Sequence, residues 1–135
     1  MTDLLDLALA LGIIVSGASA SMPAGGFEGN PLWCDGKLPE YPHGSLTYSL
    51  DEEWFAMPIQ LYEEGLVHCG DRIMVQDKRG KIWVARALDA SELHVKLSYL
   101  GLPFVVEAPE HMGIGTMPVT VVNLTRLERL QELRP

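Results

Sequence analysis

The sequence is poor in basic residues. Its 135 residues include 10 Lys and Arg against 18 Asp and Glu, which gives a formal net charge of -8. Nucleic acids and anionic lipid surfaces attract basic proteins, so this balance argues against both kinds of partner. We therefore expect no nucleic-acid partner. Neutral or cationic partners, including polysaccharides, remain open.

Cysteine is also scarce, and no metal-binding pattern is present. The two cysteines, Cys34 and Cys69, are too few for a disulfide-rich scaffold. They are a candidate disulfide that would stabilise the fold by roughly 3.5–4 kcal/mol through loop closure, and two buried free thiols are the alternative. The four histidines lack metal-ligand spacing, and no phosphate-binding loop or serine nucleophile motif occurs. We expect no metal and no cofactor.

Long apolar runs are limited to the start of the chain. No charge occurs between Asp6 and Glu28, and the first half of this run is strongly apolar. An apolar stretch followed by Ala18-Ser19-Ala20 is typical of a secretory signal, but the positive residues that normally precede one are missing. A retained helix is the alternative. It would use residues 4–15 to contact a membrane or other subunits.

The rest of the chain has the composition of one globular domain. Apolar residues make up 47% and charged residues 21%, which excludes a disordered chain. We divide it into residues 1–20 (helical arm or signal-like segment), 21–50 (Gly/Pro-rich loop), 51–124 (β-barrel) and 125–135 (C-terminal helix). Thr125 and Glu128 predict a capping box at the start of that last helix.

Short strand signals at close spacing predict a mainly β fold. A hairpin with a turn at Gly80 is the clearest signal. A short helix is expected over residues 59–64, ending at Gly65. The predicted strands span residues 45–50, 72–76, 81–88, 93–97, 104–107 and 119–123.

Two stretches together resemble a known barrel family. The first runs from Cys69-Gly70 through the alternating strand residues to Asp89, and the second joins residues 95–101 to the glycine-containing strand at 113–122. Over about residues 65–124 the chain resembles the double-psi β-barrel of rare-lipoprotein-A-like lytic transglycosylases, barwin and expansins. The resemblance implies a small six-stranded double-psi-like barrel.

The resemblance also implies catalytic residues. The family's catalytic acid at a strand end matches Asp89, and its second polar position falls near Glu64. Two positions depart from the family pattern: Ala90-Ser91 follow the Asp, and Lys96 replaces the Asp that precedes Leu-Ser. An ordinary turn aspartate and a solvent-exposed glutamate are the structural alternatives for Asp89 and Glu64.

A glycan-binding site would also contain aromatic rings on which sugars stack and a cation that pairs with the carboxylates of the substrate. The substrate-binding candidates are Trp83, Tyr99, Trp54 and Arg86, with Trp33 as a further aromatic. Trp83 is out of phase with Ile82 and Val84, so we expect it to face outward or toward a groove. The alternatives are packing for the rings and a surface ion pair for Arg86.

Two functions from different classes follow. The first is a cell-envelope-directed module that binds peptidoglycan glycan. The sequence leaves open whether Asp89 also cleaves the glycan lytically. This function implies an extracytoplasmic location. The second is a non-enzymatic structural protein, for example a virion component, that uses the barrel as a rigid block and the N-terminal arm for oligomeric assembly with other subunits.

Overall fold

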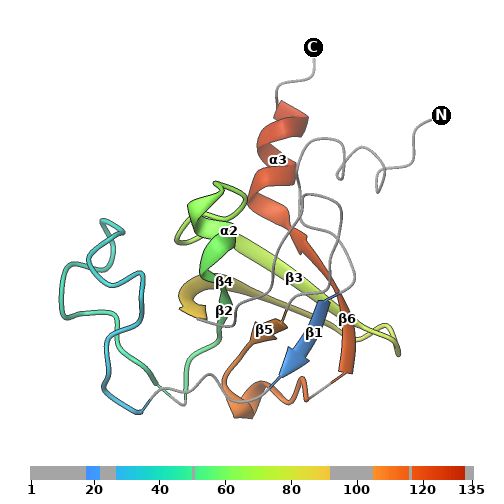
Figure 1. The fold of residues 1–135 in the computed structure, drawn as a ribbon, viewed down its shortest axis with the longest axis horizontal. Coiled ribbons are helices and arrows are strands. Elements are labelled where there is room, and N and C mark those ends of the chain that lie inside the picture. The colour runs from blue at the N-terminus through green and yellow to red at the C-terminus, as the bar shows by residue number, and fades with distance from the viewer. Residues whose placement is uncertain (1–17, 22–26, 50, 92–104, 116, 133–135) are drawn as a thin grey trace.

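A computed structural model describes residues 18–21, 27–49, 51–91, 105–115 and 117–132 (Figure 1). The expected mainly β fold is confirmed. Tyr99, Lys96, the strand predicted at 93–97 and the arm residues 4–15 lie outside the described residues. In order, the elements are β1 (Ala18–Ser21), β2 (Trp54–Pro58), α2 (Ile59–Glu63), β3 (Arg72–Asp77), β4 (Ile82–Ser91), β5 (Val105–Glu107), the 3-10 turn η1 (Glu110–Met112), β6 (Met117–Asn123) and α3 (Leu124–Glu132).

The strands are hydrogen-bonded in the order β1-β5-β2-β4-β3-β6, and β6 pairs back with β1, so the sheet closes on itself. The β1–β5 and β2–β4 ladders are parallel, and the others are antiparallel. The pairing is unchanged when β1, β2 and β3 exchange places with β4, β5 and β6, respectively. The parallel β1–β5 ladder then corresponds to the parallel β4–β2 ladder, and the antiparallel β1–β6 ladder to the antiparallel β4–β3 ladder. The pairing therefore has twofold symmetry that relates β1, β2 and β3 to β4, β5 and β6.

The predicted hairpin at Gly80 is confirmed as β3 and β4, which pair antiparallel from Arg72↔Arg86 to Gln76↔Ile82. Asp77 organises its turn, because Oδ1 accepts the backbone N–H groups of Arg79 and Lys81, each at 2.9 Å. Gly80 has a φ of 88°, a left-handed conformation that favours glycine. The strands predicted at 104–107 and 119–123 are β5 and β6.

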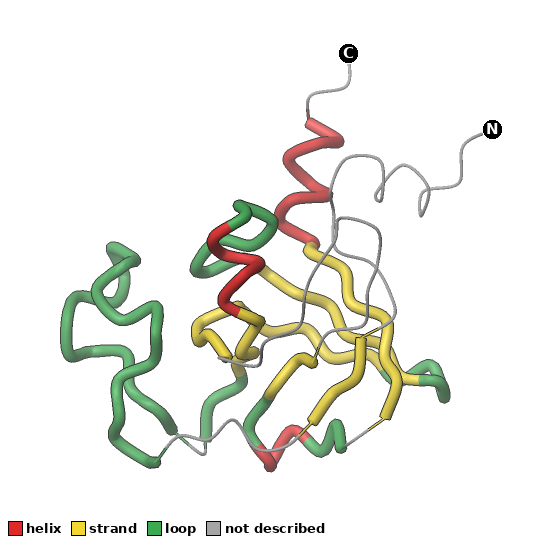
Figure 2. Tube along the Cα trace, viewed as in Figure 1, coloured by secondary structure: helices red, strands yellow, loops and turns green. Residues whose placement is uncertain are grey.

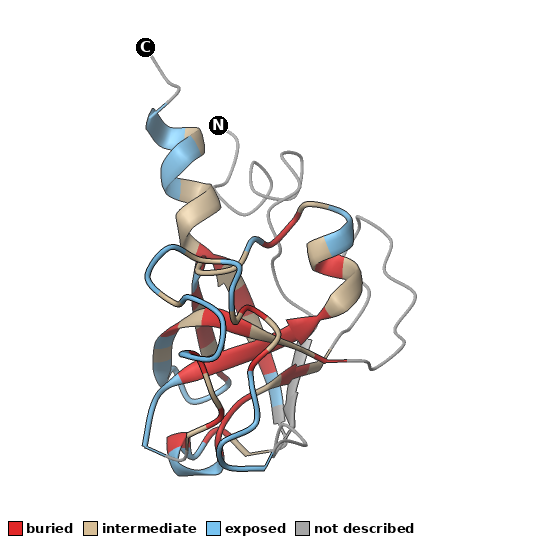
Figure 3. Cartoon of the chain, turned by 90° about the vertical axis from the view of Figure 1, so that its left-hand side faces the viewer, coloured by how far each residue is buried: buried red, intermediate tan, exposed pale blue. Residues whose placement is uncertain are grey.

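Two hydrophobic clusters lie on the two faces of β2 and β4. The inner cluster fills the barrel, and burial alternates along β3 as a strand with one face in a core requires (Figure 3). The outer cluster lies between the barrel and residues 27–49, which form one long loop outside the strands (Figure 2). The outer cluster consists of Leu32, Cys34, Leu46, Tyr48, Trp54, Ala56 and Leu88.

The prediction of a strand over residues 45–50 is wrong for the described part of that range, where only an isolated bridge joins Thr47 to Pro31. The loop instead satisfies its own backbone: the Asp35 carboxylate accepts the N–H groups of Gly44 and Leu46 at 2.7 and 2.9 Å. Residues 18–21 form β1, which crosses the boundary expected at residue 20.

The C-terminal helix is present, but its predicted cap is wrong. The Asn123 side chain caps α3 by accepting the N–H of Arg126 at 3.1 Å. The Thr125 hydroxyl instead accepts the N–H of Arg72 at 2.8 Å, and Glu128 forms an ion pair with Arg72. Both capping-box residues are therefore engaged by β3. The shorter helix was predicted correctly and is followed by Gly65 at a φ of 74°.

Neither helix in the described ranges is long and apolar enough to cross a membrane.

Candidate functional site

Asp89 lies on β4 directly after a bulge. Phe55 pairs with Ala87 and the next residue of β2, Ala56, pairs with Asp89, so Leu88 is an extra residue on β4. Ala87 belongs to the inner cluster, whereas Leu88 and Ala56 belong to the outer one. The bulge therefore directs the end of β4 toward the outer face, beside the loop.

The Asp89 carboxyl is held by that loop. Its Oδ1 accepts the backbone N–H of Trp33 at 2.9 Å, and its backbone oxygen accepts the Tyr62 hydroxyl at 2.7 Å. Burial raises the pKa of the Asp89 carboxyl, and the N–H groups of Trp33 and Ala90 oppose that rise without cancelling it. The group is thus fixed in position and biased toward its protonated form.

An aromatic pair lies next to Asp89. The rings of Trp33 and Tyr62 have their centroids 4.5 Å apart at an angle of 42°. The Lys37 ammonium lies 4.4 Å from the centre of the Trp33 ring. Burial, and then the charges of Asp89 and Asp71, raise the pKa of the Tyr62 hydroxyl, so it stays protonated and donates its hydrogen bond to the Asp89 backbone carbonyl.

Glu107 is a site residue that the sequence analysis missed. It pairs with Ala56 from β5, on the side of β2 opposite to Asp89. Burial raises the pKa of the Glu107 carboxyl, and the charge of Asp89 raises it further. An acid at the end of a predicted strand was the available signal, whereas Asp89 was chosen through the family resemblance.

Among the described residues, no interaction joins Glu64 to Asp89 or Glu107. It is the C-terminal cap of α2, is exposed, and donates its backbone N–H to the Gln60 carbonyl at 2.9 Å. This is the geometry of the solvent-exposed acid that the sequence analysis gave as the alternative.

Trp54 and Trp83, the other two tryptophans that the structure describes, pack against the hydrophobic clusters. Trp54 is fully buried and meets Tyr48 edge-on at 5.3 Å, which rules out its predicted role as a surface for sugars. Trp83 is half-buried against the inner cluster and donates its indole N–H to the Met112 carbonyl at 2.9 Å. The prediction that Trp83 faces outward is therefore corrected.

Arg86 forms the contacts expected of a structural cation. Its Nη1 lies 2.8 Å from Oε2 of Glu40, and its Nε donates to the Gly70 carbonyl at 3.2 Å. A Cβ added to Gly70 would lie 2.7 Å from Nη2 of Arg86, so a side chain there would displace the guanidinium group. The alternative of an ion pair describes Arg86 better than substrate binding.

The candidate disulfide is confirmed. Cys34 and Cys69 are bonded, with their Cα atoms 5.7 Å apart and a sequence separation of 35 residues. The bond joins the loop that supplies Trp33 to the segment between α2 and β3. It therefore helps to hold the Trp33 N–H against Asp89.

Among the described residues, no group of His, Cys, Asp and Glu side chains has the arrangement of a metal site.

Compared with known proteins, the sequence matches no protein-family model, and it matches none of the curated proteins.

Proposed function

We propose that this protein is an extracytoplasmic double-psi barrel that binds peptidoglycan glycan and cleaves it, with Asp89 as the general acid and base. The observation that carries the proposal is the Asp89 carboxyl, which is partly buried, has a raised pKa and lies beside the Trp33–Tyr62 pair. A group that protonates a glycosidic oxygen needs such a raised pKa.

The strand pairing supports the barrel assignment. A double-psi barrel requires two equivalent interlocked halves, and the ladders have twofold symmetry of that kind. The position of the acid at the end of β4 agrees with the sequence resemblance, which matched the family's acid to Asp89.

The proposed reaction needs one group that gives and then takes a proton. Asp89 donates its proton to the glycosidic oxygen while the bond between that oxygen and the anomeric carbon breaks. A hydroxyl of the same sugar attacks the anomeric carbon and forms an internal ring, and its proton returns to Asp89. No water is consumed, and the products are an anhydro-sugar end and a free hydroxyl on the leaving sugar.

Glu107 lies across Ala56 from Asp89. The charge of Asp89 raises the pKa of the Glu107 carboxyl, because like charges at close range repel. The Trp33–Tyr62 pair offers an aromatic surface for a sugar ring. The Cys34–Cys69 bond is compatible with an extracytoplasmic location, where disulfides persist.

The test is the release of soluble fragments from purified peptidoglycan by the wild type, Asp89→Asn and Glu64→Gln. Asparagine keeps an oxygen that accepts the Trp33 N–H but cannot supply the proton. Loss of a general acid lowers rates by about a hundredfold or more, so Asp89→Asn is expected to lose cleavage by at least that factor. Glu64→Gln is the matched control and is expected to cleave normally.

Sedimentation with insoluble peptidoglycan separates binding from cleavage. Asp89→Asn is expected to co-sediment like the wild type. Cleavage by Asp89→Asn at the wild-type rate would contradict the proposed role of Asp89. Binding by the wild type without any release of fragments would leave only the binding part of the proposal.

An assembly protein is the second candidate function, and helix α3 favours it. None of the residues of α3 is buried, and the helix projects from the barrel (Figure 1). Ile82 and Val84 on β4 are exposed apolar side chains. Light scattering of the purified full-length chain tests this function: a stable oligomer supports it, and a monomer at all concentrations counts against it.

A further inference from the structure

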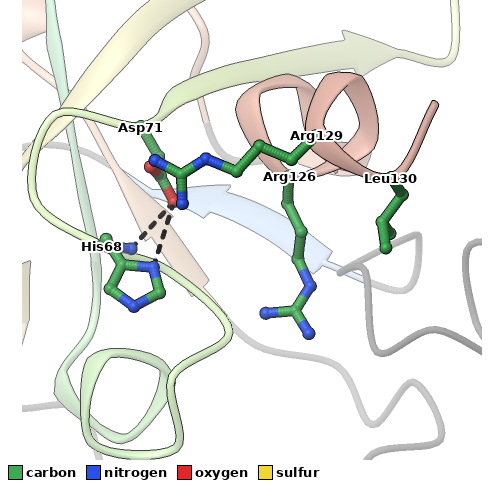
Figure 4. Close-up of a pocket in the computed structure, with 5 residues that line it drawn as sticks. All are labelled: His68, Asp71, Arg126, Arg129 and Leu130. Carbon is green, nitrogen blue, oxygen red and sulfur yellow. Dashed lines mark hydrogen bonds and ion pairs between the residues drawn. The ribbon is translucent and has the colours of Figure 1, made fainter. Parts of the chain in front are cut away.

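A pocket lies between α3 and the segment that leads into β3. Its volume is about 200 Å³. His68 and Asp71 line it from the segment before β3, and Arg126, Arg129 and Leu130 line it from α3 (Figure 4). None of these residues was among the predicted site residues.

The carboxylate of Asp71 already has hydrogen-bond partners within the protein. Asp71 is buried, and its Oδ2 accepts the backbone N–H of His68 and the side-chain amide of Asn123, each at 2.9 Å. The ring Nδ1 of His68 lies 3.9 Å from the same oxygen. Asp71 thus faces the polypeptide and leaves Arg129 available to a ligand.

The two arginines of the pocket differ in the contacts that they form. Arg126 donates from Nη1 to the Gly65 carbonyl at 2.8 Å, which fixes its guanidinium at the pocket wall. Arg129 is exposed, and within the described residues it forms no hydrogen bond or ion pair. Arg129 therefore contributes an exposed guanidinium group to this pocket, on a chain whose net charge is -8.

We propose that this pocket binds the carboxylate of a small aliphatic ligand. Arginine side chains match a carboxylate with paired N–H donors, and Arg129 is available to provide them. The Leu130 side chain offers an apolar contact for a short carbon stem. A cavity of about 150 Å³ accommodates a benzene molecule, so 200 Å³ has room for a carboxylate with a few carbons. The carboxylate of Asp71 disfavours a doubly charged phosphate in the same space.

The experiment is an NMR titration of the full-length chain with butyrate, with butyramide as its neutral counterpart, and with inorganic phosphate. Butyrate is expected to shift the Leu130 methyl and His68 ring signals along a saturating curve, while butyramide leaves them unchanged. Arg129→Gln is expected to weaken butyrate binding about tenfold, because it removes a charge-assisted hydrogen bond. The control, Lys78→Gln, removes the same charge from an exposed turn residue and is expected to bind like the wild type.

Three results would overturn the proposal. Equal responses to butyrate and butyramide, or no response to either, would remove the role of the carboxylate. Equal weakening in Arg129→Gln and Lys78→Gln would reduce the effect to net charge. Phosphate binding as tight as that of butyrate would exclude a carboxylate-selective site. None of these results bears on peptidoglycan cleavage by Asp89, so the two proposals fail separately.

Discussion

Asp89 and Glu107 lie on opposite sides of the same residue, Ala56, in strands that flank β2. Both carboxyl groups have raised pKa values, chiefly because of burial, and the charge of Asp89 adds to the rise at Glu107. The two acids are therefore electrically coupled, and ionised Asp89 delays the ionisation of Glu107.

The first prediction concerns the titration of Glu107. In Asp89→Asn the charge that raises the pKa of the Glu107 carboxyl is gone, so that pKa falls. We expect the NMR titration profile of the Glu107 carboxyl to move to lower pH in this variant. Glu110→Gln, at an exposed position on η1, is the control and is expected to leave the profile unchanged.

The opposite assignment of the two acids gives a different result. If Glu107 were the group that protonates the glycosidic oxygen, Glu107→Gln would abolish cleavage at every pH, and Asp89→Asn would retain it. That pattern would transfer the catalytic role from Asp89 to Glu107.

The second prediction concerns stability. The ordinary pKa values are 3.8 for Asp89 and 4.5 for Glu107, and both are raised in the folded protein. As pH rises through these values, the unfolded chain loses its protons first, so the wild type loses folding free energy until the folded groups also ionise. Glu107→Gln lacks one of the two groups. Its free energy of unfolding, measured by urea denaturation, is expected to increase relative to the wild type from below pH 4.5 to neutrality. A difference that stays constant with pH would contradict the raised pKa of Glu107.

The third prediction concerns the Cys34–Cys69 bond. Replacing both cysteines by alanine is expected to lower the free energy of unfolding by about 4 kcal/mol, the chain-entropy value for a loop of this length. Because Cys34 adjoins Trp33, the same variant is expected to lose cleavage activity at temperatures where it remains folded. Denaturant unfolding and peptidoglycan digestion measure the two effects. Unchanged activity in the folded variant would show that the bond does not position the Trp33 N–H.

The fourth prediction concerns Asn123, which is fully buried. Its amide donates to the Leu66 carbonyl at 3.1 Å and to Asp71, and its oxygen caps α3. Asn123→Ala removes the cap and leaves buried groups unsatisfied, so we expect a loss of about 2–4 kcal/mol in unfolding free energy. Thr125→Val is the comparison for the cap that the sequence predicted, and we expect it to cost less. A larger loss for Thr125→Val would restore the predicted cap.

The sequence predicts those parts of the fold that depend on local patterns. The alternation in β3 and the turn at Gly80 define the hairpin without reference to the rest of the chain. Asp89 was singled out by the resemblance to a barrel family whose catalytic acid lies at a strand end. The cap of α3 was mispredicted because Thr125 and Glu128 contact Arg72, a residue 53 positions away from Thr125.

The candidate site depends on pairings that no local pattern encodes. Glu107 was missed because its relation to Asp89 exists only through β2, which pairs with β4 on one side and β5 on the other. Trp54 was taken for a surface ring because the local sequence does not show that residues 27–49 cover it. The role of Trp33 depends on the same loop, which brings its backbone N–H to Asp89, 56 positions along the chain.

The most direct test of the account is the mass of the sugar ends that the purified protein releases from peptidoglycan. The account predicts ends that lack the elements of one water molecule, because a hydroxyl of the substrate attacks, and it predicts that Asp89→Asn releases none of them. Ends that have gained water, or identical products from the wild type and Asp89→Asn, would contradict it.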